Sequence, residues 1–348
     1  MALVWIDLRE FRLPREITYT AFGLGLIALG AFTKSAQFPA HIWLPGAYTE
    51  PDDDFTAMLS AVVSKAAVFG LVLVAAQLGV RSEIGLDPAY VLGWVGILTA
   101  TFGALMAVFQ EDVKRLLAYS SMGQLGYIVA AIALMNHLGW VTALYLSVNH
   151  FLYKGILFLA VAGVIMRTGT RLMYRMGGLI KNLPWTFFAV MIAIIAMSGV
   201  PPLTGFGGKW MLFNAMMDKG WYWLAALAFF SSAVAFLYMF RLLQTVFLGQ
   251  RKLEHKDLSE APAILLIPQF VLIVVIATPW LAGPHCPKHL VIATGSKDGA
   301  YYADKKQISA SIEKDSWLLA KTGIYMKFYF DSDDKLAKYT IEEIVTGL

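Results

Sequence analysis

The chain has 348 residues, of which 58% are hydrophobic and only 15% are charged. Soluble domains carry about 25% charged residues, so this composition excludes a protein whose surface is mostly solvated. The net charge of +4 does not indicate nucleic-acid binding, and the single cysteine, Cys286, excludes an internal disulfide framework and a cysteine-based metal cluster.

Apolar runs of about 20 residues recur along the chain, and each is long enough to span a bilayer. In chain order we expect them at Ile17–Phe32, Phe55–Leu78, Tyr90–Phe109, Leu116–Met135, Trp140–Met166, Trp185–Val200, Trp221–Leu248 and Ala261–Leu281. A ninth, shorter segment at Leu203–Met217 continues the sixth after a break. The sequence therefore predicts an all-α polytopic membrane protein with about eight transmembrane helices embedded in a lipid bilayer.

Composition divides the chain into three parts. Residues 1–16 predict an interfacial lead-in, residues 17–283 a transmembrane domain, and residues 284–348 a far more charged, soluble C-terminal tail. We expect the tail to be a small α+β piece with strands at His289–Ala293 and Ile324–Phe330 and helices at Ala303–Lys314 and Asp334–Val345. Its segment IATGSKDGAYY resembles the first strand and loop of extracytoplasmic solute-binding proteins; the alternative is an ordinary docking tail.

Basic residues predict the orientation in the membrane. Arg167, Arg171, Arg175 and Lys181 gather in one loop, which the positive-inside rule places in the cytoplasm. We expect an integral protein of a prokaryotic cytoplasmic (inner) membrane.

Two apolar helices carry predicted breaks. Pro39 follows Lys34 closely, and Pro201, Pro202 and Gly205 precede Lys209. A helix break at membrane depth leaves backbone groups unpaired, so it is tolerated only inside protein or beside a water-filled cavity. Broken helices beside ionisable residues are typical of transporters.

Lys34, Lys65, Lys154 and Lys209 lie within or against apolar stretches. A lysine facing hydrocarbon costs several kcal/mol, so such a residue usually lines a polar path. His150 lies four positions before Lys154, one helical turn away on the same face. A desolvated ammonium group exchanges protons near neutrality, as histidine does. These five residues predict a proton relay; for Lys34 and Lys209 the alternative is a lysine snorkelling at a helix end.

Other charged residues have simpler interpretations. The cluster Glu111, Asp112, Lys114 and Arg115 predicts a solvated turn between helices. We expect Arg241 to anchor the end of a helix. The sequence contains no P-loop, no dinucleotide motif in a βαβ context and no Cys or His spacing for a metal, so we expect no cofactor in this chain. Energy for ion movement would come from a partner or from an ion gradient.

Four segments identify a family resemblance: TKSAQFPAHIWLPGAYTEP, QEDVKRLLAYSSMGQLGYI, NHFLYKGILFLAVAG and MSGVPPLTGFGGKW. They resemble, in the right order, the antiporter-like subunits of respiratory complex I, of group 4 membrane-bound hydrogenases and formate hydrogenlyases, and of Mrp-type sodium/proton antiporters. The resemblance implies the C-terminal part of a bundle of about fourteen helices with two inverted repeats, each containing a broken helix.

The resemblance also implies roles. Lys34 is similar to the family's lysine at the break of the seventh helix, which a glutamate on the fifth helix normally partners. Lys65 is similar to the bridging lysine of the eighth helix. His150 and Lys154 match the eleventh helix, and Lys209 matches the terminal lysine at the break of the twelfth.

The sequence departs from the family pattern at several positions. The resemblance starts at the seventh helix, so either another chain supplies the first six helices, or the sequence is partial, or the first half-channel is lost. Gly46 replaces an acidic residue, Asp52–Asp54 replace an apolar run, and Ser60 stands where many relatives have histidine. The serine favours the Mrp or hydrogenase branch over complex I proper.

The leading hypothesis is a non-redox, proton- or cation-translocating subunit of a larger NADH/quinone oxidoreductase-like or hydrogenase-like complex. Its expected partners are other membrane subunits and, elsewhere in the complex, Fe–S redox subunits, with no nucleic acid. The alternatives are an antiporter module driven by a gradient alone and a non-conducting scaffold subunit.

Overall fold

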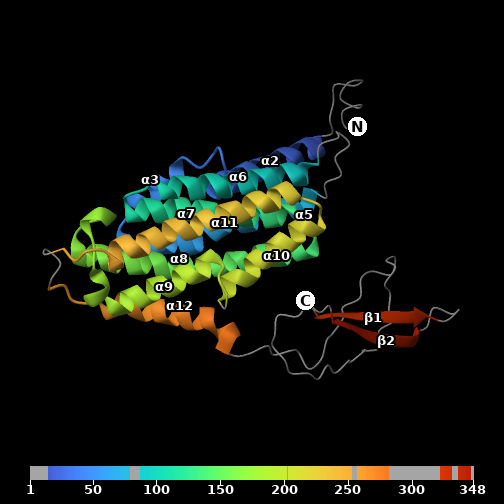
Figure 1. Cartoon of the computed structure of the whole chain (residues 1–348). Helices are drawn as coiled ribbons and strands as arrows, with labels where there is room; N and C mark the ends of the chain where they lie inside the picture. The colour runs from blue at the N-terminus through green and yellow to red at the C-terminus, as the bar shows by residue number, and fades with distance from the viewer. Residues whose placement is uncertain are drawn as a thin grey trace. The chain divides into compact units, whose positions relative to one another are not determined.

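The computed structural model describes residues 15–78, 87–201, 203–252, 257–281, 322–330 and 336–345. It divides into two compact units, Met1–Leu281 and Ala282–Leu348 (Figure 1). In its described part the first unit consists of helices, which lie alongside one another in a bundle (Figure 1). The described part of the second unit is a pair of strands.

The helices of the first unit follow the expected apolar runs. In chain order they are α2 (Arg15–Lys34), α3 (Trp43–Thr49), α4 (Asp53–Met58), α5 (Ser64–Leu78), α6 (Pro88–Val108), α7 (Val113–Ala133), α8 (His137–Thr168), α9 (Pro184–Ser198), α10 (Thr204–Asp218), α11 (Tyr222–Leu243) and α12 (Ala263–Leu281). The π-helical turn η1 (Leu59–Val63) joins α4 to α5, and a second one, η4 (Gln244–Leu248), extends α11. Two short 3-10 helices, η2 (Met173–Arg175) and η3 (Leu179–Lys181), lie between α8 and α9.

Five helical segments of the described residues are long and apolar enough to cross a membrane: Phe55–Ala75, Pro88–Val108, Val113–Ala133, His137–Thr168 and Tyr222–Leu248. The apolar parts of α2, α9 and α12 are shorter, at Gly25–Lys34, Pro184–Ser198 and Ala263–Ala277. The prediction of an all-α polytopic membrane protein is confirmed.

Helix α7 forms the centre of the bundle. The other helices bury 94% of the most apolar stretch of α7, against 44% for α6 and for α11. The remaining faces of α6 and α11 expose large apolar side chains such as Leu98 and Phe229. An apolar side chain exposed on a membrane helix is available to lipid or to a neighbouring membrane chain, whereas α7 is surrounded by other helices. Polar side chains on α7, such as Ser120 and Gln124, are therefore held inside protein and away from lipid.

Glycines bring α6 and α7 into close contact. A Cβ atom on Gly126 would lie 2.5 Å from the Gly96 carbonyl oxygen, and one on Gly103 would lie 2.8 Å from the Gly123 nitrogen. Small residues let membrane helices approach each other because van der Waals packing, rather than the hydrophobic effect, holds them together.

Both predicted helix breaks have a clear local structure. α2 ends at Lys34, and residues 35–42, including the cis peptide bond Phe38–Pro39, separate it from α3. α9 ends at Ser198, where Gly199 takes the left-handed conformation with φ of 75°, and α10 begins at Thr204. Pro201 lies in this second break; Pro202 lies outside the described residues.

The C-terminal tail corrects one prediction. Strand β1 (Thr322–Phe330) confirms the expected strand there, but the segment expected to form a helix at Asp334–Val345 is strand β2 (Leu336–Val345). The two strands pair antiparallel, with Phe328 opposite Tyr339. The β-branched residues of TIEEIV favour a strand, and pairing with β1 supplies the hydrogen bonds that decide it. The expected elements His289–Ala293 and Ala303–Lys314 lie outside the described residues.

Candidate functional site

Lys65 and His150 form the closest contact between two of the predicted relay residues. The Lys65 Nζ atom lies 2.5 Å from the His150 Nδ1 atom, although the residues are 85 positions apart. Lys65 is half-buried and His150 is completely buried. A single proton between these two nitrogens can belong to either side chain, because a charged ammonium group donates to a neutral imidazole and a charged imidazolium donates to a neutral amine.

The π-helical turn η1 lies just before Lys65 and supplies one of its hydrogen-bond acceptors. The Lys65 Nζ atom donates to the Ser60 carbonyl oxygen at 2.9 Å and to the Ser64 hydroxyl at 3.2 Å. A π-turn widens the helix and displaces the regular ladder, and such turns often occur at functional sites. Here the turn gives the lysine a carbonyl oxygen of its own helix as an acceptor.

Lys154 is fully buried between α8 and α7. Its Nζ atom donates to the Leu117 carbonyl oxygen at 3.0 Å and makes a short hydrogen bond to the Ser120 hydroxyl. It also lies 5.8 Å from the centre of the Phe158 ring. His150, one turn earlier on α8, interacts electrostatically with both Lys154 and Lys65. These three basic side chains therefore form one cluster at the middle of the bundle.

Lys209 lies at the second helix break. Its Nζ atom donates to the Ser198 carbonyl oxygen at 3.0 Å and to the Ser232 hydroxyl at 2.8 Å. The glycine at position 205 lets the start of α10 lie against the end of α9, because a Cβ atom on Gly205 would collide with the Ala196 carbonyl oxygen. The last carbonyl groups of a helix carry partial negative charge, so the C-terminus of α9 stabilises the ammonium group.

Buried tyrosines lie between Lys154 and Lys209. The Tyr127 ring lies 5.6 Å from the Lys209 Nζ atom, and its hydroxyl lies 2.7 Å from the Ser231 hydroxyl oxygen. Tyr238, from α11, interacts with Ser120, which also bonds Lys154. The sequence analysis did not single out these tyrosines. Their positions in the middle of apolar spans were the available signal.

The structure does not bring Lys34 into this cluster. It is exposed at the end of α2, and it has no ion-pair partner within the described part of the chain. It lines a cavity of about 670 Å³ that also reaches Tyr48 and Ser64. Pro39 is exposed in the same break, whereas Gly205 is buried in the other.

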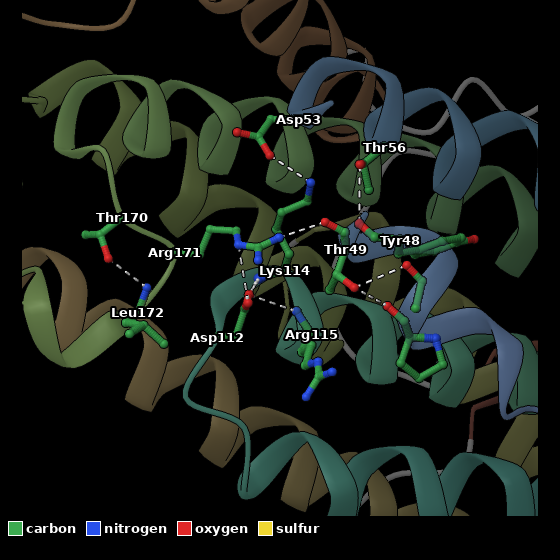
Figure 2. A network of polar contacts seen from close by, with 12 residues as sticks. Tyr48, Thr49, Asp53, Thr56, Asp112, Lys114, Arg115, Thr170, Arg171 and Leu172 are labelled. Carbon is green, nitrogen blue, oxygen red and sulfur yellow. Dashed lines mark hydrogen bonds and ion pairs between the residues drawn. The ribbon is translucent and has the colours of Figure 1, made fainter. Parts of the chain in front are cut away.

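A polar network at one end of the bundle corrects the prediction of a solvated turn at Lys114, whereas Glu111 and Arg115 are exposed as expected (Figure 2). Lys114 is only 2% exposed, and its Nζ atom donates to the Asp53 carboxylate at 2.7 Å and to the Pro51 carbonyl oxygen at 2.8 Å. Sequence reasoning failed here because the acceptors of Lys114 lie more than sixty positions away. Arg241, expected to anchor a helix end, donates from the last turn of α11 to the Gln110 carbonyl oxygen.

The same network connects the ends of three helices. Asp112 accepts hydrogen bonds from the first backbone N–H groups of α7 and therefore caps that helix. Arg171, which follows α8, lies 3.5 Å from the Asp112 carboxylate and donates to the Thr49 carbonyl oxygen at 2.8 Å (Figure 2). The ends of α3, α7 and α8 are thus held together.

These helices and their buried basic residues define a polytopic α-helical membrane protein with a polar interior. The family model described as NADH:quinone oxidoreductase/Mrp antiporter, TM, matches residues 8–235, and the chain belongs to this family. The match covers the four segments on which the resemblance was based, so that resemblance is confirmed.

Relatives and solved structures agree with this assignment. The chain is 33% identical to NADH-quinone oxidoreductase subunit N of Desulforudis audaxviator, over 72% of this chain and 52% of the relative. It is 34% identical to a Na(+)/H(+) antiporter subunit of Bacillus subtilis, over 71% of this chain and 33% of the relative. The chain therefore spans about half, or less, of these relatives.

The structure of the membrane-bound sulfane sulfur reductase, an archaeal respiratory membrane complex, contains a similar chain. The two are 33% identical and superpose with a TM-score of 0.70, over 79% of this chain and 48% of that one.

Proposed function

We propose that this chain is a proton- or cation-translocating, antiporter-like subunit of a multisubunit complex in a prokaryotic cytoplasmic membrane. The contact between Lys65 and His150, with Lys154 one helical turn away, carries this proposal. Three basic groups clustered at the middle of a membrane bundle are costly, and a polar path for charge is their usual role.

The mechanism follows from repulsion between neighbouring basic groups. Lys65, His150 and Lys154 lie close enough that protonation of one opposes protonation of the next. A proton that arrives at one end therefore favours release from the neighbouring group. The hydroxyl groups of Ser120, Tyr238 and Tyr127 extend this path toward Lys209.

The partners are part of the proposal. The relatives named NADH-quinone oxidoreductase and the similar chain of a respiratory membrane complex support a place among other membrane subunits. In such a complex, redox subunits with Fe–S clusters would supply the energy. The relative named Na(+)/H(+) antiporter favours the second candidate, a module that is driven by an ion gradient alone.

The test is proton translocation by the complex that copurifies with this tagged chain, reconstituted into liposomes. Lys154→Ala is expected to lower the initial rate at least about tenfold, because a positioned proton-transfer group contributes that much or more. Lys181→Ala, at an exposed lysine, is the control and is expected to translocate as wild type does. A native gel checks that both variants assemble.

An assembled Lys154→Ala complex with normal translocation would show that the chain is a scaffold. Fe–S absorbance in the purified complex would support the redox-driven candidate, and its absence in a translocating complex would support the gradient-driven one.

A further inference from the structure

The second helix break surrounds the Lys209 ammonium group with neutral oxygen atoms. Its Nζ atom donates to the carbonyl oxygen of Ser198, the last residue of α9, at 3.0 Å and to the Ser232 hydroxyl of α11 at 2.8 Å. Lys209 is only 4% exposed, and among the described residues no carboxylate lies within ion-pair distance of it. A positive charge is therefore held here without a negative partner.

Two further hydroxyl groups belong to the same break. They are the side chains of Ser198, at the end of α9, and Thr204, at the start of α10. Both oxygen atoms are buried, and neither has a hydrogen-bond partner within the described part of the chain. Because a buried polar atom without a partner costs free energy, a bound water or ion is a common partner for such an atom.

The end of α9 has the form of a cation site. Hard cations prefer oxygen ligands, and carbonyl oxygen atoms can replace the hydration shell of an alkali-metal ion. In transporters with broken helices, unwound carbonyl groups and the C-terminal ends of half-helices coordinate such ions. Helix α9 stops at Ser198, and Gly199, with φ of 75°, turns the chain so that the terminal carbonyl group of Ser198 bonds a cation, the Lys209 ammonium.

We propose that the second helix break is a binding site for an alkali-metal cation, Na⁺ or K⁺, which competes with the protonated Lys209 side chain. The ligands are the Ser198 carbonyl and hydroxyl oxygen atoms and the hydroxyl oxygen atoms of Thr204 and Ser232. This inference rests on the proposed function, because it names the ion that the chain exchanges for a proton at the Lys209 end of the relay.

The competition follows from charge. The ammonium group and a bound cation share the Ser198 and Ser232 oxygen atoms, and two positive charges this close repel each other, so only one of them occupies the site. When Lys209 gives up its proton, it becomes a neutral amine and the cation enters. When the proton returns, the cation leaves. One proton is exchanged for one cation, and the charge of the site stays the same.

Few other titratable groups surround Lys209. Helices α9 and α12 contain no Asp, Glu, His, Lys or Arg. Asp218, at the far end of α10, is nine positions away, about 14 Å along the helix. Contacts lead from Lys209 and its helix to Tyr127 of α7, Tyr238 of α11 and Tyr145 of α8, with Lys154 of α8 beyond them. Tyrosine ordinarily titrates near pH 10, so Lys209 itself is the group whose charge decides the competition.

The test is cation binding by the purified complex that contains this chain, measured with radioactive Na⁺ and, in a second arm, with radioactive Rb⁺ as a probe for K⁺. Ser198→Ala and Thr204→Val remove proposed ligands, and Ser198→Ala keeps the carbonyl oxygen. The matched controls, Thr142→Val and Ser147→Ala, remove hydroxyl groups that, among the described residues, bond only to carbonyl groups of their own helix, at 2.6 and 2.7 Å.

We expect Ser198→Ala and Thr204→Val to weaken binding at least about tenfold, because each removes an oxygen atom that bonds a charge, and the controls to stay within about twofold of wild type. Equal affinities in the ligand variants and the controls would overturn the inference. Absence of binding of both ions by wild type would overturn it too. Binding of one ion and not the other would support the site and identify its cation.

Lys209→Met tests the competition, because it keeps most of the side-chain length and removes the charge. We compare about pH 6 with about pH 9, on either side of the range in which a desolvated lysine exchanges its proton. Wild type is expected to bind the cation about tenfold more tightly at the higher pH, because the protonated fraction cannot bind. Lys209→Met is expected to bind equally at both. A Lys209→Met complex with the pH dependence of wild type would overturn the inference.

Thermal unfolding keeps the inference testable if Ser198→Ala or Thr204→Val does not assemble. A bound cation raises the unfolding temperature, so NaCl or KCl is compared with choline chloride at equal ionic strength. Wild type is expected to gain more stability from the metal salt at about pH 9 than at about pH 6, and Lys209→Met to gain equally at both. Equal stability in the metal and choline salts, in both complexes, would overturn the site.

Binding and translocation fail separately. If Lys154→Ala stops proton translocation and the break binds no cation, only this inference fails, and the chain moves protons alone. If the assembled Lys154→Ala complex translocates normally, the proposed function fails, whereas cation binding that Ser198→Ala weakens would still support the site.

Discussion

His150 lies between two lysines, Lys65 across the helix interface and Lys154 on its own helix. Its Nδ1 atom faces Lys65, and its Nε2 atom has no hydrogen-bond partner among the described residues. A histidine with one ring nitrogen engaged and the other free can pass a proton by exchanging which nitrogen carries it.

We expect His150→Gln to lower the rate of proton translocation at least about tenfold while the complex still assembles, because the amide fills similar space but does not titrate. Initial rates in proteoliposomes measure this effect. His137→Gln, at the exposed start of α8, is the control. Normal translocation by His150→Gln would remove the histidine from the relay.

The Lys114–Asp53 pair contributes to stability at the residue scale. Lys114→Met leaves the Asp53 carboxylate without its cation, and we expect the free energy of unfolding to fall by about 1–3 kcal/mol, less than for a fully buried pair because Asp53 is partly exposed. Thermal unfolding of the purified complex, in Lys114→Met, Asp53→Asn and the double variant, gives the interaction energy. Additive losses would show that the pair contributes nothing.

At the scale of elements, long-range contacts fix the positions of helix ends. Glu260 lies just before α12 but accepts hydrogen bonds from the Trp185 backbone N–H at 2.8 Å and the Thr186 hydroxyl at 2.7 Å, both in the first turn of α9. A carboxylate at a helix N-terminus stabilises it through hydrogen bonds and the helix dipole. The Arg167 guanidinium at the end of α8 donates to the Glu260 carbonyl oxygen, so one residue joins three helices.

The packing of α6 against α7 gives a prediction at this scale. Gly126→Leu would place a side chain against backbone atoms of Gly96 and Ala100, which lie 2.5 and 2.6 Å from the new Cβ. The backbone cannot move aside easily, so we expect loss of the assembled complex on a native gel. Gly25→Leu is the control, because no atom of the described residues lies within 4 Å of its Cβ position. Normal assembly of Gly126→Leu would show that the two helices can separate.

At the scale of the whole molecule, the proposed relay requires α7 and α11 to connect Lys154 with Lys209. Ser120, Tyr127 and Tyr238 lie between the two lysines, and all three are buried. Their contacts lead from one lysine toward the other, so we expect these hydroxyl groups to carry the connection.

We expect Tyr127→Phe to slow proton translocation several-fold without changing assembly, because it removes the hydroxyl and keeps the ring against Lys209. Tyr174→Phe, at an exposed tyrosine, is the control. Unchanged translocation in Tyr127→Phe would mean that protons reach Lys209 by another route.

The sequence by itself determined the membrane class, the positions of the apolar helices, the two breaks and the family. These features depend on local properties: apolar length, the conformational limits of proline and glycine, and the cost of a lysine in hydrocarbon. It also identified Lys65, His150, Lys154 and Lys209 as residues that need a polar partner, although their role in translocation stays a prediction.

Only the tertiary structure decided which of these residues meet. Lys65 contacts His150 because α4 and η1 pack against α8, and Lys114 is buried because Asp53 and the Pro51 carbonyl group lie opposite it. The strand at Leu336–Val345 likewise depends on its pairing with β1. For Lys65 and Lys114 the deciding partner is more than sixty positions away in the chain, and for the strand it is the pairing with a neighbouring strand, so the local pattern of each segment could not predict the outcome.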